Sequence, residues 1–213
     1  MKRSTLIRIL LFNAVLLAGC QEGHKDTDVN PPAAGFNLAD SDPAAVELAD
    51  SVMAAMGGRE NWDKTRYISW NFFGRRNLVW DKWQGRVRIE SIPDSTIYLV
   101  NLDGPTGRVQ IAGREVTDPD SLRELVSRAK SIWINDSYWL VMPLKLKDSG
   151  VTLKYLGEDT TLTGQKANVL ELTFDNVGDT PENKYRVYVD MEDNLVKQWA
   201  YYQDARQDSA SQI

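Results

Sequence analysis

The sequence has few of the side chains on which most catalytic and metal sites depend. Among 213 residues it contains one cysteine, Cys20, and one histidine, His24. A single cysteine excludes a disulfide within the chain, so a folded domain must draw its stability from its core. Because both residues precede the first predicted helix, we exclude a Ser-His pair, a Cys-His pair and a histidine-containing metal cluster from the folded part. A glycine-rich phosphate loop is also lacking. We therefore expect neither an enzyme nor a cofactor.

One enzymatic alternative stays open, a hydrolase that uses carboxylates alone as acid and base. The candidate residues are Asp136, Asp148, Glu158 and Glu171. Asp and Glu are mostly solvated surface residues, however, and Asp148 and Glu158 stand beside glycines in segments typical of turns. Of the functions considered, this one is the least favoured.

Long hydrophobic runs are also lacking, apart from one short run near the N-terminus. It covers residues 9–17 and follows a basic segment that contains Lys2, Arg3 and Arg8. A permanent membrane-spanning helix needs about 20 apolar residues, so this run is too short. A basic segment followed by a short apolar run is typical of an export signal. We predict that residues 1–19 are a signal peptide.

The residues that follow the apolar run resemble the lipobox of bacterial lipoproteins. The segment reads Leu17-Ala18-Gly19-Cys20, with small residues at the expected cleavage point and cysteine directly after it. A lone cysteine is usually a small buried core residue, but position 20 has no core to enter. We predict that Cys20 carries fatty acyl groups such as palmitate and that the partner of this segment is a membrane. Each buried methylene contributes about 0.8 kcal/mol, so such an anchor holds a protein on a bilayer.

The net charge of the chain excludes one class of partner, and the residue after the cysteine indicates the cellular location. Without residues 1–19, the chain keeps 22 basic and 30 acidic residues, a formal charge of −8. An acidic surface repels phosphates, so we expect no nucleic-acid partner. By resemblance to sorting signals, Gln21 in place of aspartate favours the outer membrane of the cell envelope, at its periplasmic face or at the cell surface. The oligomeric state stays open.

The remaining chain divides into a linker, one domain and a tail. Residues 20–43 are polar without an apolar period and predict a flexible tether. Residues 44–204 have the size of a single domain, and residues 205–213 form a polar tail. A first helix begins at Ser41 or Asp42, with Pro43 in its first turn, and ends at Gly57-Gly58.

Alternating apolar residues predict strands on both sides of a long helix. Three strands over residues 66–90 and two more over 97–100 and 107–111 precede the helix, and four or five strands follow it over 151–203. The helix begins at Asp118-Pro119, is interrupted at Asn135-Asp136, and resumes at residues 138–142 before Pro143. We predict an α+β fold with a curved, incomplete antiparallel β-barrel of about nine to eleven strands. Its helices form a lid over the concave face.

Tryptophan is the most distinctive component, with seven in the chain. Several lie on the inward phase of a strand or on the apolar stripe of the long helix. They either fill the core or line an apolar cavity around a hydrophobic ligand, and periodicity does not separate the two. The tentative ligand-binding residues are Trp70, Trp80, Trp133, Trp139, Met142 and Lys145.

The segment from Trp133 to Lys147 is either a buried helical connection or a movable lid. In the second interpretation Asn135-Asp136 is the hinge, and Trp139 and Met142 face the ligand. Lys145 and Lys147 then lie at the mouth near an anionic group. Apolar helical stripes are usually core, which favours the first interpretation.

Several segments together resemble an uncharacterised family of bacterial lipoproteins placed with the LolA/LolB-like lipoprotein carrier fold. They are the lipobox, Met56-Gly57-Gly58 with Trp62, Leu78 to Asp81 ahead of Gly85 to Arg88, Trp133 to Lys147, and Tyr185 to Asp190. The resemblance covers about residues 44–204. It implies an incomplete barrel with a helical lid over an apolar cavity that takes lipid or the acyl groups of lipoproteins. The family has no catalytic motif.

These observations predict a membrane-anchored lipoprotein that binds a hydrophobic ligand, a lipid or an acyl chain, without catalysis. The alternative is a structural or protein-interaction lipoprotein of the envelope with a solid core.

Overall fold

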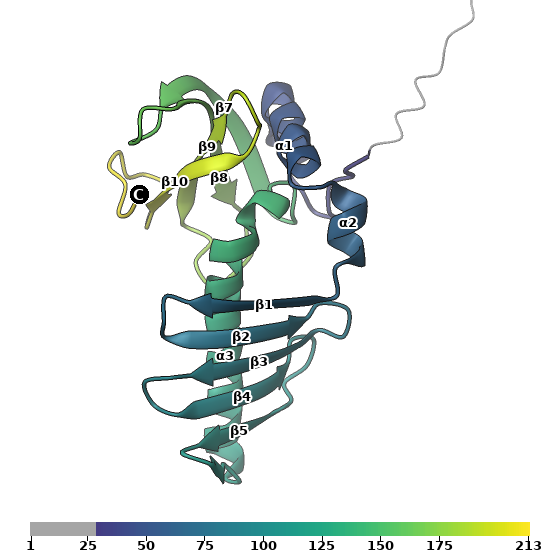
Figure 1. Ribbon diagram of the computed structural model, residues 1–213, viewed down its shortest axis with the longest axis vertical. Coiled ribbons are helices and arrows are strands. Elements are labelled where there is room, and N and C mark those ends of the chain that lie inside the picture. The colour runs from purple at the N-terminus through teal and green to yellow at the C-terminus, as the bar shows by residue number, and fades with distance from the viewer. Residues whose placement is uncertain (1–28) are drawn as a thin grey trace, which may run out of the picture.

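The computed structural model describes residues 29–213 and has an α+β fold. Its strands form two antiparallel sheets, one of six strands and one of four. In Figure 1 the two sheets lie at opposite ends of an elongated molecule, and the longest helix, α3, runs along it behind the larger sheet. The predicted signal peptide and Cys20 lie outside the described residues.

The six-stranded sheet is a meander in which each strand pairs with the next. Its strands are β1 (Tyr67–Phe72), β2 (Arg76–Asp81), β3 (Arg86–Ser91), β4 (Thr96–Asn101), β5 (Gly107–Ile111) and β6 (Arg114–Glu115). The first five match the sequence prediction, because alternate residues such as Leu78, Trp80 and Ile89 are buried on one face. β6 has only two residues and no apolar period, so no pattern in the sequence predicts it.

The four-stranded sheet follows α3 and has the order β10-β9-β8-β7. Its strands are β7 (Val151–Thr160), β8 (Lys166–Phe174), β9 (Lys184–Asp190) and β10 (Val196–Tyr202). These strands were predicted, and they form a second sheet that is separate from the first. The outer edge of β10 pairs with the C-terminal residues: Tyr201 N donates to Gln212 O at 2.8 Å, and Ser211 N donates to Tyr201 O at 2.7 Å. The predicted polar tail is therefore bound to the sheet.

Each sheet has its own hydrophobic core. The larger sheet packs its buried face on Val126 and Ala129 in the first half of α3 (Pro119–Val141). The smaller sheet packs on Ala45, Ala49 and Val52 of α1 (Pro43–Ala55) and on a short 3₁₀ helix, η2 (Met142–Leu144). At 1.5 Å per residue, α3 is about 35 Å long, enough to reach from one core to the other.

The start and end of α1 follow the prediction. Asp42 is the residue before the helix and Pro43 is its first residue, while Gly57 and Gly58, at φ +102° and +86°, end it in a conformation that favours glycine. The short helix α2 (Arg59–Lys64) then leads to β1. The Asp42 carboxylate does not cap its own helix. It accepts from Tyr155 N at 3.0 Å and thereby joins the start of α1 to β7.

The segment before α1 is ordered along the smaller sheet, which corrects part of the predicted tether. It contains the 3₁₀ helix η1 (Leu38–Asp40). Ala33 N donates to Lys147 O at 2.9 Å, and Asn37 N donates to Val151 O at 3.0 Å. Residues 29–43 therefore belong to the fold. The part of the predicted tether before residue 29 lies outside the described residues.

Helix α3 is continuous through Asn135 and Asp136, so the predicted interruption was wrong. Short polar side chains break helices by competing for backbone hydrogen bonds. Here the Asp136 carboxylate is fully buried and accepts instead from Arg76 of β2, with Nε–Oδ2 and Nη2–Oδ1 distances of 2.6 and 2.9 Å. Asn135 Nδ2 donates to the same carboxylate at 2.9 Å. This carboxylate raises the pKa of the Arg76 guanidinium by hydrogen bonding.

We predict that Arg76→Met lowers the free energy of unfolding by about 3 kcal/mol, because it leaves a buried carboxylate without its partner. The double variant Arg76→Met/Asp136→Met should recover most of the loss. Urea unfolding measures both. Arg88→Met is the matched control, because Arg88 pairs with Glu90 at a site where both side chains are about 40% exposed. It should cost less than about 1 kcal/mol. Equal losses for the two single variants would contradict a structural role for the Arg76–Asp136 pair.

Candidate functional site

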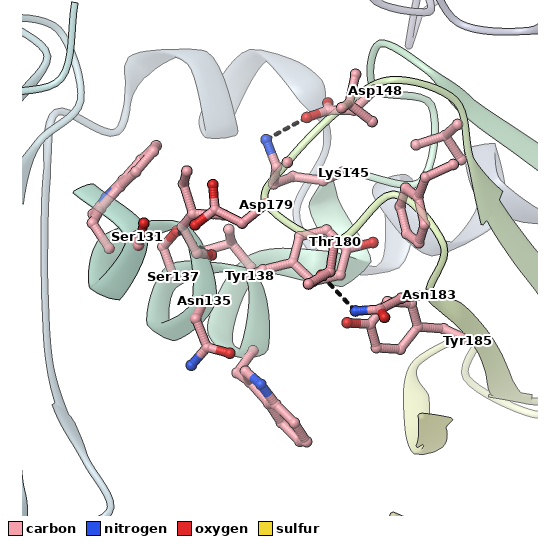
Figure 2. Close-up of a pocket in the computed structure, with 18 of the residues that line it drawn as sticks. Ser131, Asn135, Ser137, Tyr138, Lys145, Asp148, Asp179, Thr180, Asn183 and Tyr185 are labelled. Carbon is pink, nitrogen blue, oxygen red and sulfur yellow. Dashed lines mark hydrogen bonds and ion pairs between the residues drawn. The ribbon is translucent and has the colours of Figure 1, made fainter. Parts of the chain in front are cut away.

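A cavity of about 610 Å³ lies where the two cores meet (Figure 2). One wall is the second half of α3, from Ser131 to Val141, and the opposite wall is formed by β9, β10 and the loop over residues 175–183. Trp80 of β2 closes one end. The volume is within the range of about 300–1,000 Å³ that small-molecule sites occupy.

Aromatic rings form most of the apolar lining. Trp80 and Trp133 contact edge to face, with ring centroids 5.1 Å apart. At the other end Tyr138, Phe174 and Tyr185 form a triangle with centroid distances between 5.5 and 6.0 Å. These arrangements are favourable pairings of aromatic rings, so they hold the walls in place without filling the space between them.

Three buried polar atoms of this lining have no hydrogen-bond partner. They are Nε1 of Trp80, Nε1 of Trp133 and the hydroxyl of Tyr138. Across residues 29–213, the only other buried side-chain N or O atom without a partner is Nε1 of Trp70. Buried polar groups are nearly always paired, so these atoms are exceptions, and each of them has almost no accessible surface.

Polar side chains form much of the remaining lining. Lys145 forms an ion pair with Asp148, and Asp179 adds a second carboxylate to the same lining. Asn183 Nδ2 donates to Thr180 Oγ1 at 2.6 Å, and the Tyr201 hydroxyl donates to Asn183 Oδ1 at 3.4 Å. Figure 2 shows the Lys145–Asp148 and Thr180–Asn183 interactions. Apart from Asp179, each of these polar groups therefore has a partner within the set.

The phenols in the cavity resist ionisation. Burial raises the pKa of Tyr138 well above its usual value, and the neighbouring Tyr185 and Asp148 raise it further. Burial also raises the pKa of Tyr185 to about 12, partly offset by its hydrogen bond with Asn183. Both phenols are therefore neutral near pH 7, and this part of the cavity disfavours negative charge.

A wider groove of about 1,130 Å³ adjoins the cavity between β1 and β10. Asn135, Trp139 and Gln212 line both hollows. Trp70 lies on the groove, and the Trp139 and Trp199 rings are 4.3 Å apart beside it. Cavity and groove are thus neighbours, with the Trp139 ring on the lining of each.

The structure brings together most of the residues that the sequence nominated. Trp80, Trp133, Trp139 and Lys145 line the cavity, and Trp70 lines the adjoining groove. Met142 lines neither, which corrects its predicted role. Its side chain is 1% exposed and packs in the core of the smaller sheet, because η2 turns it toward α1.

The predicted lysine pair at the mouth does not form. Lys145 lines the cavity, but Lys147 is buried and its Nζ lies 2.6 Å from Asp50 of α1. The four candidate carboxylates are also dispersed. Asp148 lines the cavity, Asp136 lines the groove, Glu171 pairs with Arg186 on the smaller sheet, and Glu158 lines neither hollow.

Sequence reasoning missed the aromatic residues contributed by the smaller sheet. Tyr185 and Tyr201 stand directly opposite each other on β9 and β10, and both line the cavity. Tyr185 shares the inward phase of Val187 and Val189, so the alternation of β9 was the available signal. No sequence pattern predicts that Phe174 and the 175–183 loop lie close to α3.

No family model matches the chain, and no curated protein matches it in sequence. Within residues 29–213, no group of three or more His, Cys, Asp and Glu side chains is placed to hold a metal ion. No helix in the same described range has the length and apolarity needed to cross a membrane.

We predict that Tyr138→Phe raises the free energy of unfolding of the ligand-free protein by about 1 kcal/mol, because it removes a buried hydroxyl that has no partner. Chemical denaturation measures the change. Tyr201→Phe is the control, since its hydroxyl is bonded to Asn183. It should not stabilise the protein. Destabilisation by Tyr138→Phe would mean that a bound water satisfies this hydroxyl in solution.

Proposed function

We propose that this protein is a membrane-anchored lipoprotein that binds a hydrophobic ligand, a lipid or an acyl chain, without catalysis. In this proposal the two sheets act as the halves of an incomplete barrel, and α3 covers the space between them. The ligand enters the cavity beside α3. Lipid on Cys20 attaches the protein to the envelope, with the outer membrane favoured.

The observation that carries this proposal is the aromatic cavity at the junction of the two cores. A solid interaction module would fill this space with side chains, as native cores have few voids larger than a water molecule. Here about 610 Å³ stays open between Trp80, Trp133 and Tyr185. An open space of this size with an apolar lining supports ligand binding over the alternative of an envelope protein with a solid core.

The expected result of extracting the purified protein with organic solvent is a lipid in stoichiometric amount, identified by mass spectrometry. Delipidated protein should then bind 1-anilinonaphthalene-8-sulfonate with enhanced fluorescence. Trp139→Ala should weaken dye binding about tenfold, because it removes a wall of the cavity, and should lower the free energy of unfolding by less than about 2 kcal/mol.

Trp83→Ala is the matched control, since Trp83 is 58% exposed and lines neither the cavity nor the groove. It should leave dye binding unchanged. A lipid-free protein that does not enhance the dye's fluorescence would refute the proposal. A large drop in stability for Trp139→Ala with full ligand retention would identify Trp139 as an ordinary core residue.

The anchor has its own test. Expressed in a bacterium fed an alkyne-tagged palmitate, the full chain should incorporate the label and sediment with membranes. Cys20→Ser should abolish both the label and the sedimentation, because it removes the thiol that receives the lipid. Label incorporation by the Cys20→Ser chain would place the lipid elsewhere, and its absence from both chains would refute lipidation.

A further inference from the structure

One face of the larger sheet is left open by the rest of the described chain. The buried side chains of β2 to β5 pack on α3, and in Figure 1 the opposite face is turned toward the viewer, in front of that helix. The register of the strands places Ser69, Val79, Arg88, Leu99 and Arg108 in one row across this open face. The solvated face of an antiparallel sheet is usually polar, whereas this row contains apolar side chains as well.

The open face combines apolar side chains with arginines around a shallow hollow of about 530 Å³. Tyr67, Val79 and Leu99 line this hollow and are 61%, 43% and 39% exposed. The arginines on the same lining are Arg86, Arg88 and Arg108. Tyrosine is enriched at the interface between membrane and water, and a guanidinium binds phosphate through two parallel hydrogen bonds. This composition suits the head-group region of a bilayer, where phosphates lie next to apolar chains.

The open face carries a positive charge although the protein is acidic. The charged residues that line the hollow and their ion-pair partners are Arg66, Arg86, Arg88, Arg108, Asp81, Glu90 and Glu115, a net charge of 4 − 3 = +1. The chain from residue 20 onward has a formal charge of −8, so the rest of it carries −9. Arg86 has no ion-pair partner among residues 29–213, while the other three arginines each have one. A surface of anionic lipids therefore attracts this face and repels the rest of the protein.

The predicted anchor keeps the described domain close to its membrane. Because residues 29–43 belong to the fold, only residues 21–28 separate Cys20 from it. The nine steps along the chain from Cys20 to Val29 span at most about 30 Å when fully extended. A protein attached at Cys20 therefore keeps part of its surface within this distance of the lipid.

The start of the described chain lies beside one end of the open face. Arg59 of α2 donates to the Pro31 carbonyl at 3.2 Å and forms an ion pair with Asp63 at 2.9 Å. The Asp63 carbonyl in turn accepts from Trp83 Nε1 at 3.1 Å. Trp83 lies in the turn between β2 and β3, two residues after Asp81 of the hollow. One bilayer surface can therefore receive the anchor and contact this face.

We propose that the open face of the larger sheet rests on the bilayer. Tyr67, Val79 and Leu99 then lie among the head groups, and the arginines of the hollow bind lipid phosphates. This proposal rests on the proposed anchor at Cys20 and adds which face the anchor brings to the membrane. In this orientation α3 lies on the side of the sheet that is turned away from the lipid.

The test places one fluorophore on each of three sides of the molecule. Lipid on Cys20 blocks the only native thiol, so a nitrobenzoxadiazole reagent labels a cysteine introduced as Ser69→Cys, Ser127→Cys or Leu162→Cys. Ser69 is exposed on the open face opposite Val79, and Ser127 is exposed on α3 behind the sheet. Leu162 is exposed beside the groove. Each protein is purified from bacterial membranes in detergent and reconstituted into vesicles of equal parts phosphatidylethanolamine and phosphatidylglycerol.

We expect the label of Ser69→Cys to shift its emission to shorter wavelength in these vesicles. Phospholipid that carries a spin label next to its head group should quench it, because the open face then lies within reach of that group. The labels of Ser127→Cys and Leu162→Cys should keep the emission of a fluorophore in water and should not be quenched.

Two double variants, each introduced into the Ser69→Cys protein, separate the open face from overall charge. Arg86→Gln/Arg108→Gln should lower the ratio of docked to undocked protein, read from the quenched fraction, by about tenfold or more. Arg123→Gln/Arg128→Gln is the matched control, because it removes the same charge from exposed residues of α3. It should leave the quenching unchanged.

Other outcomes overturn the proposal in distinguishable ways. A protein that does not float with the vesicles lacks the anchor, so both the anchor and the docking fail. A protein that floats while the label of Ser69→Cys stays in water keeps the anchor and loses the docking. Quenching at Ser127→Cys or Leu162→Cys in place of Ser69→Cys assigns the membrane contact to another face. Equal effects of the two double variants would show that overall charge, and not the open face, governs the contact.

Discussion

The ion pair between Asp136 and Arg76 joins α3 to β2 close to the point where the two cores meet. Asp136 is fully buried in the second half of the longest helix, and Arg76 reaches it from the larger sheet with two hydrogen bonds. The pair fixes the rotation and the depth of α3 against this sheet. The same half of the helix carries Trp133, Tyr138 and Trp139, so the direction in which each of these rings points depends on that contact. A buried charge pair contributes little net stability, but its hydrogen bonds fix the position of the two elements that carry it.

The cavity follows from the way the two cores share one helix. Val126 and Ala129 pack on the larger sheet, whereas the smaller sheet packs mainly on α1 and η2. Neither core extends over the whole of α3 between them. The rings there contact one another, Trp80 and Trp133 edge to face and Tyr138 and Tyr185 at a tilt, and they leave space beside them. Apolar walls with a few polar groups are the usual composition of a small-molecule or cofactor site, which supports the ligand-binding function proposed above.

The C-terminal residues cover the outer edge of the smaller sheet. Ser211 and Gln212 pair with Tyr201 at the edge of β10, and Gln212 also lines both the cavity and the groove. An open β10 edge would be free to pair with another strand, and β1 lies across the groove from it. The tail thus occupies this edge and contributes to the wall of the candidate site. This role depends on backbone hydrogen bonds that any polar sequence can make.

Local patterns in the sequence determined the elements: alternation in β1 to β5, the proline and glycines at the two ends of α1, and the apolar stripe of α3. They also nominated Trp80, Trp133 and Trp139, which meet at one cavity. Tertiary structure alone decided the division into two sheets, the unbroken path of α3 through Asp136, the burial of Met142 and the contribution of Tyr185 and Phe174. The physical reason is the range of the interactions. Periodicity and capping act over a few residues, whereas Arg76 and Asp136 are 60 residues apart and Tyr201 meets the chain terminus through backbone atoms that carry no sequence signal.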